Sequence, residues 1–402
     1  MKVLVYAHRL ELGGTQTNAI ELAAAVRDRH HHEVTLFASP GPSTALIEPH
    51  GLRYLEAPTV DSHPSITMIR ALREAVRQEQ PDLIHVWDWP QCLDAYYGVH
   101  LPNGIPLLCT CMSMVVPRFL PSTTLTTFGT PQLVEQGHQR TGAPAVLLEP
   151  PVDTVFNSMD AVDVTAFRDR YELTGDAVDI VVVSRLVSRL KLEGLIRAVD
   201  AVDRVAEHHN VRFTIVGEGT SADTLGRHAD AVNARHGRRV VLLTGGLVDP
   251  RPAYAAADVV VGMGSSSLRA MAFAKPLVIL GERGFSRIFE PDSAADFLYQ
   301  GMYGLGDGDL DPAPLADQME QLVTNPTRRT ELGAFGLELV RTRYGLDATA
   351  DRLEGYYQVA MARRVSGWTK AIGATRTTGL RAGDLILPDQ MKHRIRSLTG
   401  RS

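Results

Sequence analysis

The sequence of 402 residues contains three cysteines, no long hydrophobic run and no excess of charge of one sign. The cysteines, Cys92, Cys109 and Cys111, do not form a CxxC pair, and so few thiols are typical of a reducing cytoplasm. The apolar segment within residues 1–10 is too short for a signal-peptide core or a membrane span. We therefore expect a cytoplasmic protein without an integral membrane segment.

The charge of the chain also limits its partners. A formal net charge of −5 is close to balance, so composition gives no reason to expect nucleic acid or a membrane surface as a partner. We expect a small partner bound in a cleft. The length of 402 residues fits two domains of about 100 to 200 residues each.

Short β-branched segments alternate with longer helical patterns through most of the chain. Residues 2–7, 33–37 and 82–86 predict strands in the first half, and residues 15–29 and 66–80 predict helices. The same alternation starts again with a strand over residues 179–183. This order is typical of parallel sheets with crossover helices. The predicted fold class is α/β, with two Rossmann-like doubly wound domains that face each other across a cleft.

The pair Pro150-Pro151 interrupts the alternation, because consecutive prolines continue neither a helix nor a central strand. We expect an N-terminal domain over residues 1–152 and a C-terminal domain over residues 153–345. A helix over residues 346–365 is expected to pack back on the first domain.

The remaining residues, 366–402, predict a solvated or partly disordered tail. Its basic cluster consists of Lys392, Arg394 and Arg396. Short charge clusters of this kind are commonly solvated rather than bound to a membrane or a partner.

Glycine-rich or basic loops follow several expected strands. Gly13 and Gly14 precede a helix, where backbone amides can face an anion; a plain tight turn is equally consistent with them. In the second half, Arg185 and Lys191 flank a strand-to-helix loop, and Lys191 is one of only five lysines. A guanidinium and an ammonium together suit a diphosphate, whereas a solvated loop is the alternative.

A second anion cradle is predicted at the start of a later helix. Gly264, Ser265 and Ser266 lead into this helix, and Arg269 lies about one turn inside it. An ordinary serine-capped helix is the alternative. The glycines at the other strand ends, Gly217 and Gly246 among them, should lie on the same edge of the sheet, where open α/β folds bind ligands.

At these residues the sequence resembles the retaining glycosyltransferases of family 4, which have the GT-B fold. The resemblance covers most of the chain, and the order and spacing of its pieces make it specific. The matching segments are Gly13-Gly14, Pro151-Val152-Asp153, Ser184-Arg185-Leu186 with Lys191, Gly217-Glu218-Gly219, Tyr254-Ala255-Ala256-Ala257-Asp258, and Ala270-Met271-Ala272 with Lys275-Pro276.

The resemblance implies that a hexosyl group moves from a UDP- or GDP-sugar to a small-molecule or glycan acceptor, with retention of anomeric configuration and without a metal or other cofactor. It implies that Arg185 and Lys191 neutralise the leaving diphosphate, that the Gly13-Gly14 loop approaches it, and that the base lies near Gly246 and Leu247. The C-terminal domain is then the donor side and the N-terminal domain the acceptor side. The expected donor-binding residues are Gly13, Gly14, Arg185, Lys191, Gly246, Leu247, Gly264, Ser265, Ser266, Arg269 and Glu282.

Three positions depart from the family pattern. A glutamate pair that contacts the donor sugar and ribose is replaced by Val261 and Arg269, and a histidine of the first domain is replaced by Met112. We expect Glu282 to take over part of the role of the missing glutamates in recognition of the donor sugar. Arg269, which cannot act as a ribose-binding carboxylate, is expected to contact the diphosphate.

The acceptor side gives weaker signals. Trp87, Asp88 and Trp89 follow an expected strand, and two indoles beside a carboxylate can bind a sugar; core packing of both tryptophans is equally consistent. We expect acceptor contacts at Trp87, Asp88 and Met112, and we read His85 as a core residue. No catalytic residue can be assigned from spacing.

Two alternatives therefore stay open. One is a nucleotide-sugar 2-epimerase on the same fold, which needs acid and base groups in the cleft. The other is a pseudoenzyme that binds a nucleotide sugar without turnover.

Overall fold

The first domain is built around a sheet of buried parallel strands, defined in a computed structural model that describes residues 1–188, 190–363 and 365–386. On its first strand, Val3 and Val5 point into one core and Leu4 and Tyr6 into the core on the opposite face. The strand order is β3-β2-β1-β4-β5-β6-β7. The strands are β1 (Lys2–Tyr6), β2 (Glu33–Ala38), β3 (Arg53–Glu56), β4 (Leu83–Trp87), β5 (Leu107–Cys111), β6 (Leu125–Phe128) and β7 (Ala145–Leu147).

Helices cover both faces of this sheet. Helices α1 and α14 share one core with it, and α2, α3 and α5 share the other. These helices are α1 (Gly14–His30), α2 (Ile66–Glu79), α3 (Asp88–Ala95), α5 (Pro131–Thr141) and α14 (Leu346–Ala362); a short helix, α4 (Leu101–Asn103), lies among them.

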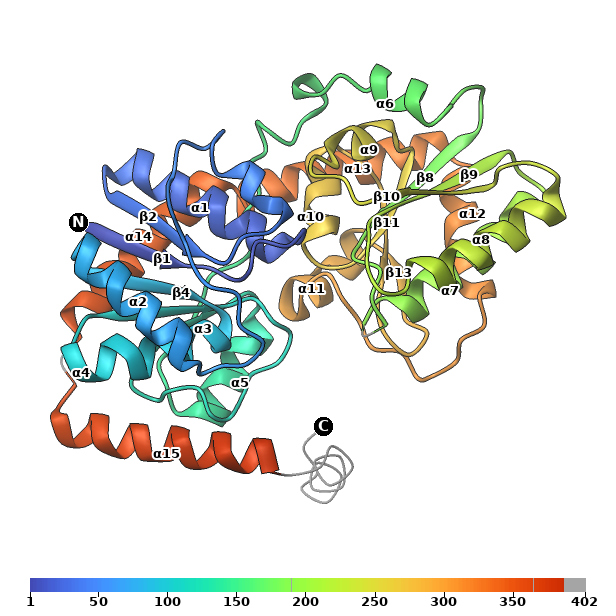
Figure 1. The fold of residues 1–402 in the computed structure, drawn as a ribbon. Coiled ribbons are helices and arrows are strands. Elements are labelled where there is room, and N and C mark those ends of the chain that lie inside the picture. Colours follow the sequence, from blue (N-terminus) through green and yellow to red (C-terminus); the bar gives the residue numbers. More distant parts are fainter. Residues whose placement is uncertain (189, 364, 387–402) are drawn as a thin grey trace.

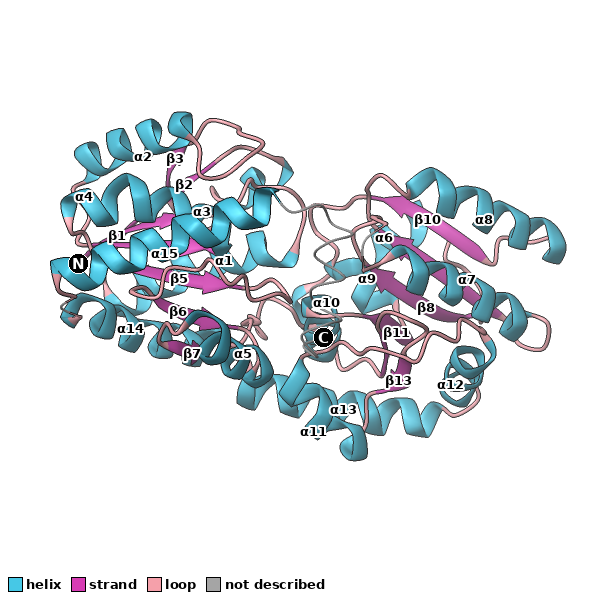
Figure 2. Ribbon diagram, turned by 90° about the horizontal axis from the view of Figure 1, so that it is seen from below, coloured by secondary structure: helices cyan, strands magenta, loops and turns pink. Residues whose placement is uncertain are grey.

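The second domain repeats the plan with a sheet of order β10-β9-β8-β11-β12-β13, in which the last pair alone is antiparallel. Its strands are β8 (Val178–Val183), β9 (Val211–Val216), β10 (Val241–Gly245), β11 (Val259–Gly262), β12 (Leu277–Leu280) and β13 (Ser286–Ile288). Its helices are α6 (Thr165–Arg170), α7 (Leu192–Ala206), α8 (Ala222–His236), α9 (Arg251–Ala256), α10 (Ser265–Ala272), α11 (Pro291–Gln300), α12 (Ala313–Val323) and α13 (Pro326–Arg343). Figure 2 shows the two sheets in separate lobes.

The chain passes between the domains twice, at neighbouring positions. Val152 donates its backbone N–H to Tyr344 and accepts one from Leu346, so the two crossings run side by side. After the second crossing, α14 lies against α1 of the first domain (Figure 1). Two side-chain contacts attach α14 to the first domain: Arg29 hydrogen-bonds to Asp351, and His32 hydrogen-bonds to Glu354.

The segment that we expect to be a solvated tail forms a helix, α15 (Gly367–Ile386), along the lower edge of the first domain in Figure 1. Thr378 hydrogen-bonds to Tyr97, and Arg381 donates to the backbone of His63. Residues 367–384 are therefore helical rather than disordered, and most of their side chains are exposed, while small residues such as Gly373 let this helix approach the domain closely. The basic cluster of Lys392, Arg394 and Arg396 lies outside the described residues.

Candidate functional site

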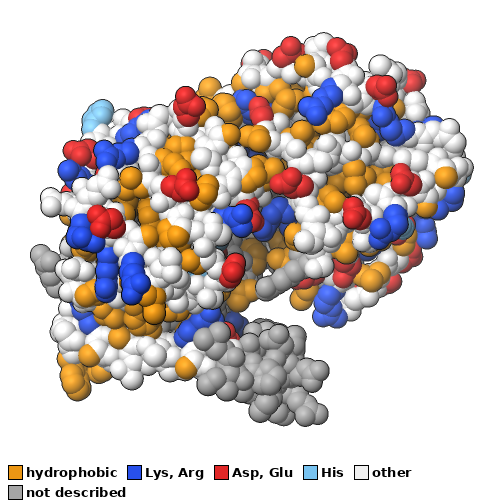
Figure 3. Space-filling view, in the orientation of Figure 1, with side chains coloured by type: hydrophobic (Ala, Val, Ile, Leu, Met, Phe, Trp, Pro, Cys, Tyr) orange, Lys and Arg blue, Asp and Glu red, His pale blue; other side chains and the backbone are white. Residues whose placement is uncertain are grey.

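Each sheet has a point at which the strand order reverses. In the first sheet this point lies between β1 and β4, and in the second it lies between β8 and β11. Loops that leave neighbouring strands there run in opposite directions and open a crevice at the carboxyl ends. The residues expected to bind ligand, Arg185 and Ser265 among them, follow β8 and β11 directly. The surface is hollowed where the two domains meet (Figure 3).

Two cations meet in this crevice on the second domain. Arg185 is exposed and Lys191 is partly exposed, and within the described residues neither side chain has an anionic or hydrogen-bonding partner. Burial, and secondarily the charge of Arg185, lower the pKa of Lys191 to about 8. Two neighbouring cations without a counter-ion form a site that attracts an anion.

Glycines of the neighbouring loop fix the position of Arg185. A β-carbon at Gly217 would lie 1.8 Å from the Ser184 carbonyl oxygen, and one at Gly219 would lie 2.4 Å from that of Leu186. Both glycines also have positive φ. The Leu186 amide donates to the Glu218 carbonyl at 2.8 Å. The strand-end glycines thus support the cationic loop rather than facing a ligand themselves.

The N-termini of α1 and α10 meet across the domain boundary. A β-carbon at Gly14 would come within 2.0 Å of the Ser265 hydroxyl oxygen, so the two helix starts are in direct contact. Gly264, which precedes α10, has φ of 67°, and Ser266 donates its hydroxyl to the Met263 carbonyl. Backbone amides of both helix starts, including those expected at Gly13 and Gly14, therefore lie at the edge of the same crevice.

Arg269 has a different partner from the one expected. Its guanidinium donates to both carboxylate oxygens of Glu21 at 3.3 and 3.2 Å and to Asn18 at 3.2 Å, both on α1 of the other domain. These contacts direct both terminal nitrogens toward α1, and the expected contact with the diphosphate stays a prediction. The same contacts join the domains.

The other expected donor residues lie around the second sheet. Gly246 packs against Glu218, because a β-carbon added at Gly246 would lie 2.6 Å from the Glu218 carboxylate. Leu247 packs on the apolar core of the second domain. Glu282 accepts a hydrogen bond from the Tyr303 hydroxyl at 2.6 Å and is partly exposed. Their roles in donor binding stay predictions.

On the acceptor side, one prediction is wrong. The side chain of Trp87 is 1% exposed and belongs to the core, so it cannot stack on a sugar. Trp89 packs edge-on against Phe119 and under Arg381 of α15. His85 is buried between Tyr357 and Thr110, and burial lowers its pKa to about 3, as befits a core residue.

Asp88 and Met112 stand at the carboxyl ends of neighbouring strands. Asp88 is buried, has φ of 69° and accepts hydrogen bonds from the Trp89 amide and the Ser113 hydroxyl. Met112 is partly exposed and lies near Gly129. A non-glycine residue at positive φ is uncommon, and such strain is often kept at functional sites.

Sequence reasoning missed His8 in this region. His8 lies 3.8 Å from the Asp88 carboxylate, measured from Nε2 to Oδ2. The electrostatic influence of Arg185 reaches His8 from the other domain. The position of His8, just after the first expected strand, could have indicated a site residue. Its partner Asp88, however, is 80 positions away in the chain, and only the order of the strands brings the two together.

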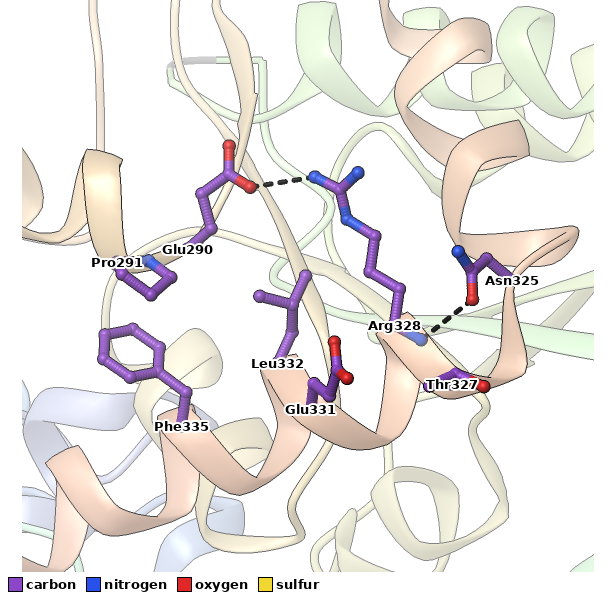
Figure 4. A pocket seen from close by; sticks show the side chains of 8 residues that line it. All are labelled: Glu290, Pro291, Asn325, Thr327, Arg328, Glu331, Leu332 and Phe335. Carbon is purple, nitrogen blue, oxygen red and sulfur yellow. Dashed lines mark hydrogen bonds and ion pairs between the residues drawn. The ribbon is translucent and has the colours of Figure 1, made fainter.

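A separate pocket lies away from the crevice. This hollow of about 500 Å³, drawn in Figure 4, lies between the starts of α11 and α13, where Glu290 pairs with Arg328. It contains none of the expected site residues.

The described residues contain neither a metal site nor a membrane span. Within them, no three histidine, cysteine or acidic side chains are arranged to hold a metal ion. None of their helices combines the length and the apolar character that a membrane-spanning helix needs.

Two doubly wound domains with ligand-binding edges turned toward each other define the GT-B class. Residues 12–129 match the family described as glycosyltransferase family 4, and residues 177–325 match the family described as glycosyl transferases group 1. The chain is a GT-B glycosyltransferase of the family 4 type. No curated protein gives a significant match.

Solved structures share the fold at low sequence identity. HepE of Anabaena, in complex with UDP-glucose, is 15% identical with a TM-score of 0.71, over 89% of this chain and 100% of its own. A glycosyltransferase of Rickettsia africae is 12% identical with a TM-score of 0.71, over 90% and 99%. A UDP-GlcNAc 2-epimerase of Neisseria meningitidis is 11% identical with a TM-score of 0.58, over 88% and 99%.

Proposed function

We propose that this glycosyltransferase takes a hexosyl group from a UDP- or GDP-sugar whose diphosphate is bound by Arg185 and Lys191. The observation that carries the proposal is the pair of neighbouring cations without a counter-ion at the reversal point of the second sheet. A diphosphate supplies two anionic groups to such a pair, and its charge grows as the sugar leaves. The UDP and UDP-glucose complexes of HepE support a uridine nucleotide as the first to test.

The finer features of the reaction follow from the resemblance. We propose retention of anomeric configuration, no requirement for a metal, an acceptor bound on the N-terminal domain, and a cytoplasmic location. Proton NMR of the anomeric signal in the first product reports the stereochemical outcome. Turnover in the presence of a chelator tests metal independence.

The decisive experiment incubates the protein with a panel of UDP- and GDP-sugars after binding is measured by calorimetry. Release of the nucleoside diphosphate with transfer or hydrolysis supports the proposal. An isomerised sugar would show the 2-epimerase instead, an alternative favoured by the ionisable groups His8 and Asp88 near the crevice. Binding without any product would show a pseudoenzyme.

A further inference from the structure

The order of the strands brings a histidine and an aspartate close together at the edge of the first domain. Strands β1 and β4 are neighbours, with Tyr6 opposite Val86. His8 lies two residues beyond the end of β1, and Asp88, the first residue of α3, directly follows the end of β4. Their Nε2 and Oδ2 atoms are 3.8 Å apart. The two neighbouring strands thus bring both residues to the same edge of the sheet, where α3 begins.

The hydrogen bonds of Asp88 leave one carboxylate oxygen for the histidine. Oδ1 accepts from the Trp89 amide at 2.8 Å and from the Ser113 hydroxyl at 3.1 Å. Oδ2 faces His8. A carboxylate held in this way favours the tautomer of His8 with its proton on Nε2 and leaves the Nδ1 lone pair available.

The environment keeps His8 neutral. Its pKa is lowered from 6.5 first by burial and then by the charges of Arg185 and His63, whereas Asp88 and Glu11 act in the opposite direction. Its Nε2 atom is buried without a hydrogen-bond partner among the described residues, while 27% of the side chain is exposed. The exposed surface therefore belongs to the other atoms of the side chain. A neutral imidazole at the edge of the crevice can accept a proton.

A second histidine lies within electrostatic reach and is fixed differently. His63 shares the buried carboxylate of Asp94 with the Tyr6 hydroxyl, and the Ser65 amide donates to the other oxygen of that carboxylate. Because Asp94 is fully engaged, it cannot substitute for Asp88. His63 instead adds a polar group beside His8 and disfavours its protonated form.

We propose that His8, oriented by Asp88, is the base that activates the acceptor hydroxyl for glycosyl transfer. The hydroxyl oxygen forms a bond to the anomeric carbon on the same face from which the diphosphate leaves, so the configuration is retained, and the bond from that carbon to the diphosphate breaks with its electron pair left on the diphosphate. The hydroxyl proton passes to His8, which later releases it to solvent. The proximity of Arg185 places this base beside the proposed diphosphate site. The inference rests on the proposed function and adds the proton acceptor that the sequence does not reveal.

The test uses the full chain with UDP-glucose, UDP-N-acetylglucosamine and GDP-mannose, and water as the first acceptor. Nucleoside diphosphate release is measured for the wild type, His8→Gln, Asp88→Asn and a control, His138→Gln, whose side chain is exposed on α5. We expect His8→Gln to lower kcat by about 100-fold or more while the Kd for UDP stays unchanged. Imidazole should partly restore turnover in His8→Gly, and the control should match the wild type.

The pH profile gives a readout that a structural role would not change. Wild-type kcat should fall only below pH 6.5, as His8 becomes protonated, and this acid limb should disappear in His8→Gln. Turnover of His8→Gln within about threefold of the wild type would overturn the role of His8 but leave the transferase intact. A wild type that releases no diphosphate from any of the three donors would overturn both proposals.

Discussion

Arg269 of the C-terminal domain is paired with Glu21 of the N-terminal domain, and the two side chains are only 11% and 3% exposed. This buried ion pair joins α10 to α1 beside the contact between Gly14 and Ser265. The domains therefore meet through a charged clasp next to the proposed diphosphate site. The contact between Tyr299 and Glu135 is a second link between them, at 2.8 Å.

The clasp predicts equal effects from both of its partners. Arg269→Ala and Glu21→Ala should each lower stability by about 3 to 5 kcal/mol, because each leaves a buried charge unpaired. The double variant should cost clearly less than the sum. Chemical denaturation of the four proteins measures the coupling. Calorimetry with UDP separates the two roles of Arg269. If Arg269 contacts the diphosphate, only Arg269→Ala should bind UDP more weakly. If Arg269 acts only through the ion pair, Arg269→Ala and Glu21→Ala should change UDP affinity by similar amounts.

Gly14→Ala should disturb the contact between the domains. Alanine has a higher helix propensity than glycine, so the substitution by itself stabilises the start of α1. The new β-carbon, however, would lie 2.0 Å from the Ser265 hydroxyl oxygen and 3.0 Å from the Ser265 β-carbon. We expect a net loss of about 1 to 3 kcal/mol, the usual cost of overpacking. Gly226→Ala in α8 is the matched control, since its β-carbon meets nothing within 4 Å, and it should be neutral or stabilising. Relief of the loss in Gly14→Ala with Ser265→Gly would identify the contact as the cause.

The two unpaired cations predict losses in nucleotide binding. Arg185→Ala and Lys191→Ala should each weaken UDP or GDP binding by about 1.5 to 3 kcal/mol, the range for hydrogen bonds to charged groups. Arg204→Ala is the control, because Arg204 is 51% exposed on α7 and pairs with Asp311. Calorimetry with unchanged binding in both test variants would refute the assignment of the site.

Lys191 also predicts a pH dependence of binding. Its pKa in the free protein is about 8, and a phosphate favours the charged form, so affinity should fall as the pH rises through 8. Between pH 7 and pH 9 we expect about a tenfold loss attributable to this group. In Lys191→Met the affinity is weaker at pH 7, and this part of the pH dependence should be absent. A wild-type affinity that stays level over the range contradicts the role of Lys191.

The domain arrangement predicts how the protein responds to ligand. The crossings at Val152 and Gly345 form a narrow hinge, and the clasp already holds the two domains in contact without ligand. Binding of UDP should therefore change the small-angle scattering profile less in the wild type than in Arg269→Ala. Equal changes in the two proteins would show that the clasp does not restrain the hinge.

The sequence predicted the α/β class because buried parallel strands are continuous β-branched segments, as in residues 180–183. It missed β3 and β13, which are short edge strands with polar residues such as Arg53 and Arg287, and it also missed β6, a buried four-residue strand with two threonines. It also missed α11, which lies between the last strand and Pro312. The helix α15 was read as a tail because its packed face consists of small residues, which give no strong periodic pattern.

The sequence by itself determined the features that are local: the strand-to-helix loops, the presence of Arg185 and Lys191 in one of them, and the glycines that such loops require. Only the tertiary structure decided the features that depend on distant partners. Arg269 meets Glu21 across 248 positions, His8 meets Asp88 through the order of the sheet, and Trp87 is buried under helices from both ends of the chain. A side chain's type and neighbours in sequence limit the interactions it can make. Which of these it makes depends on the surfaces that packing brings against it, and these come from segments far away in the chain.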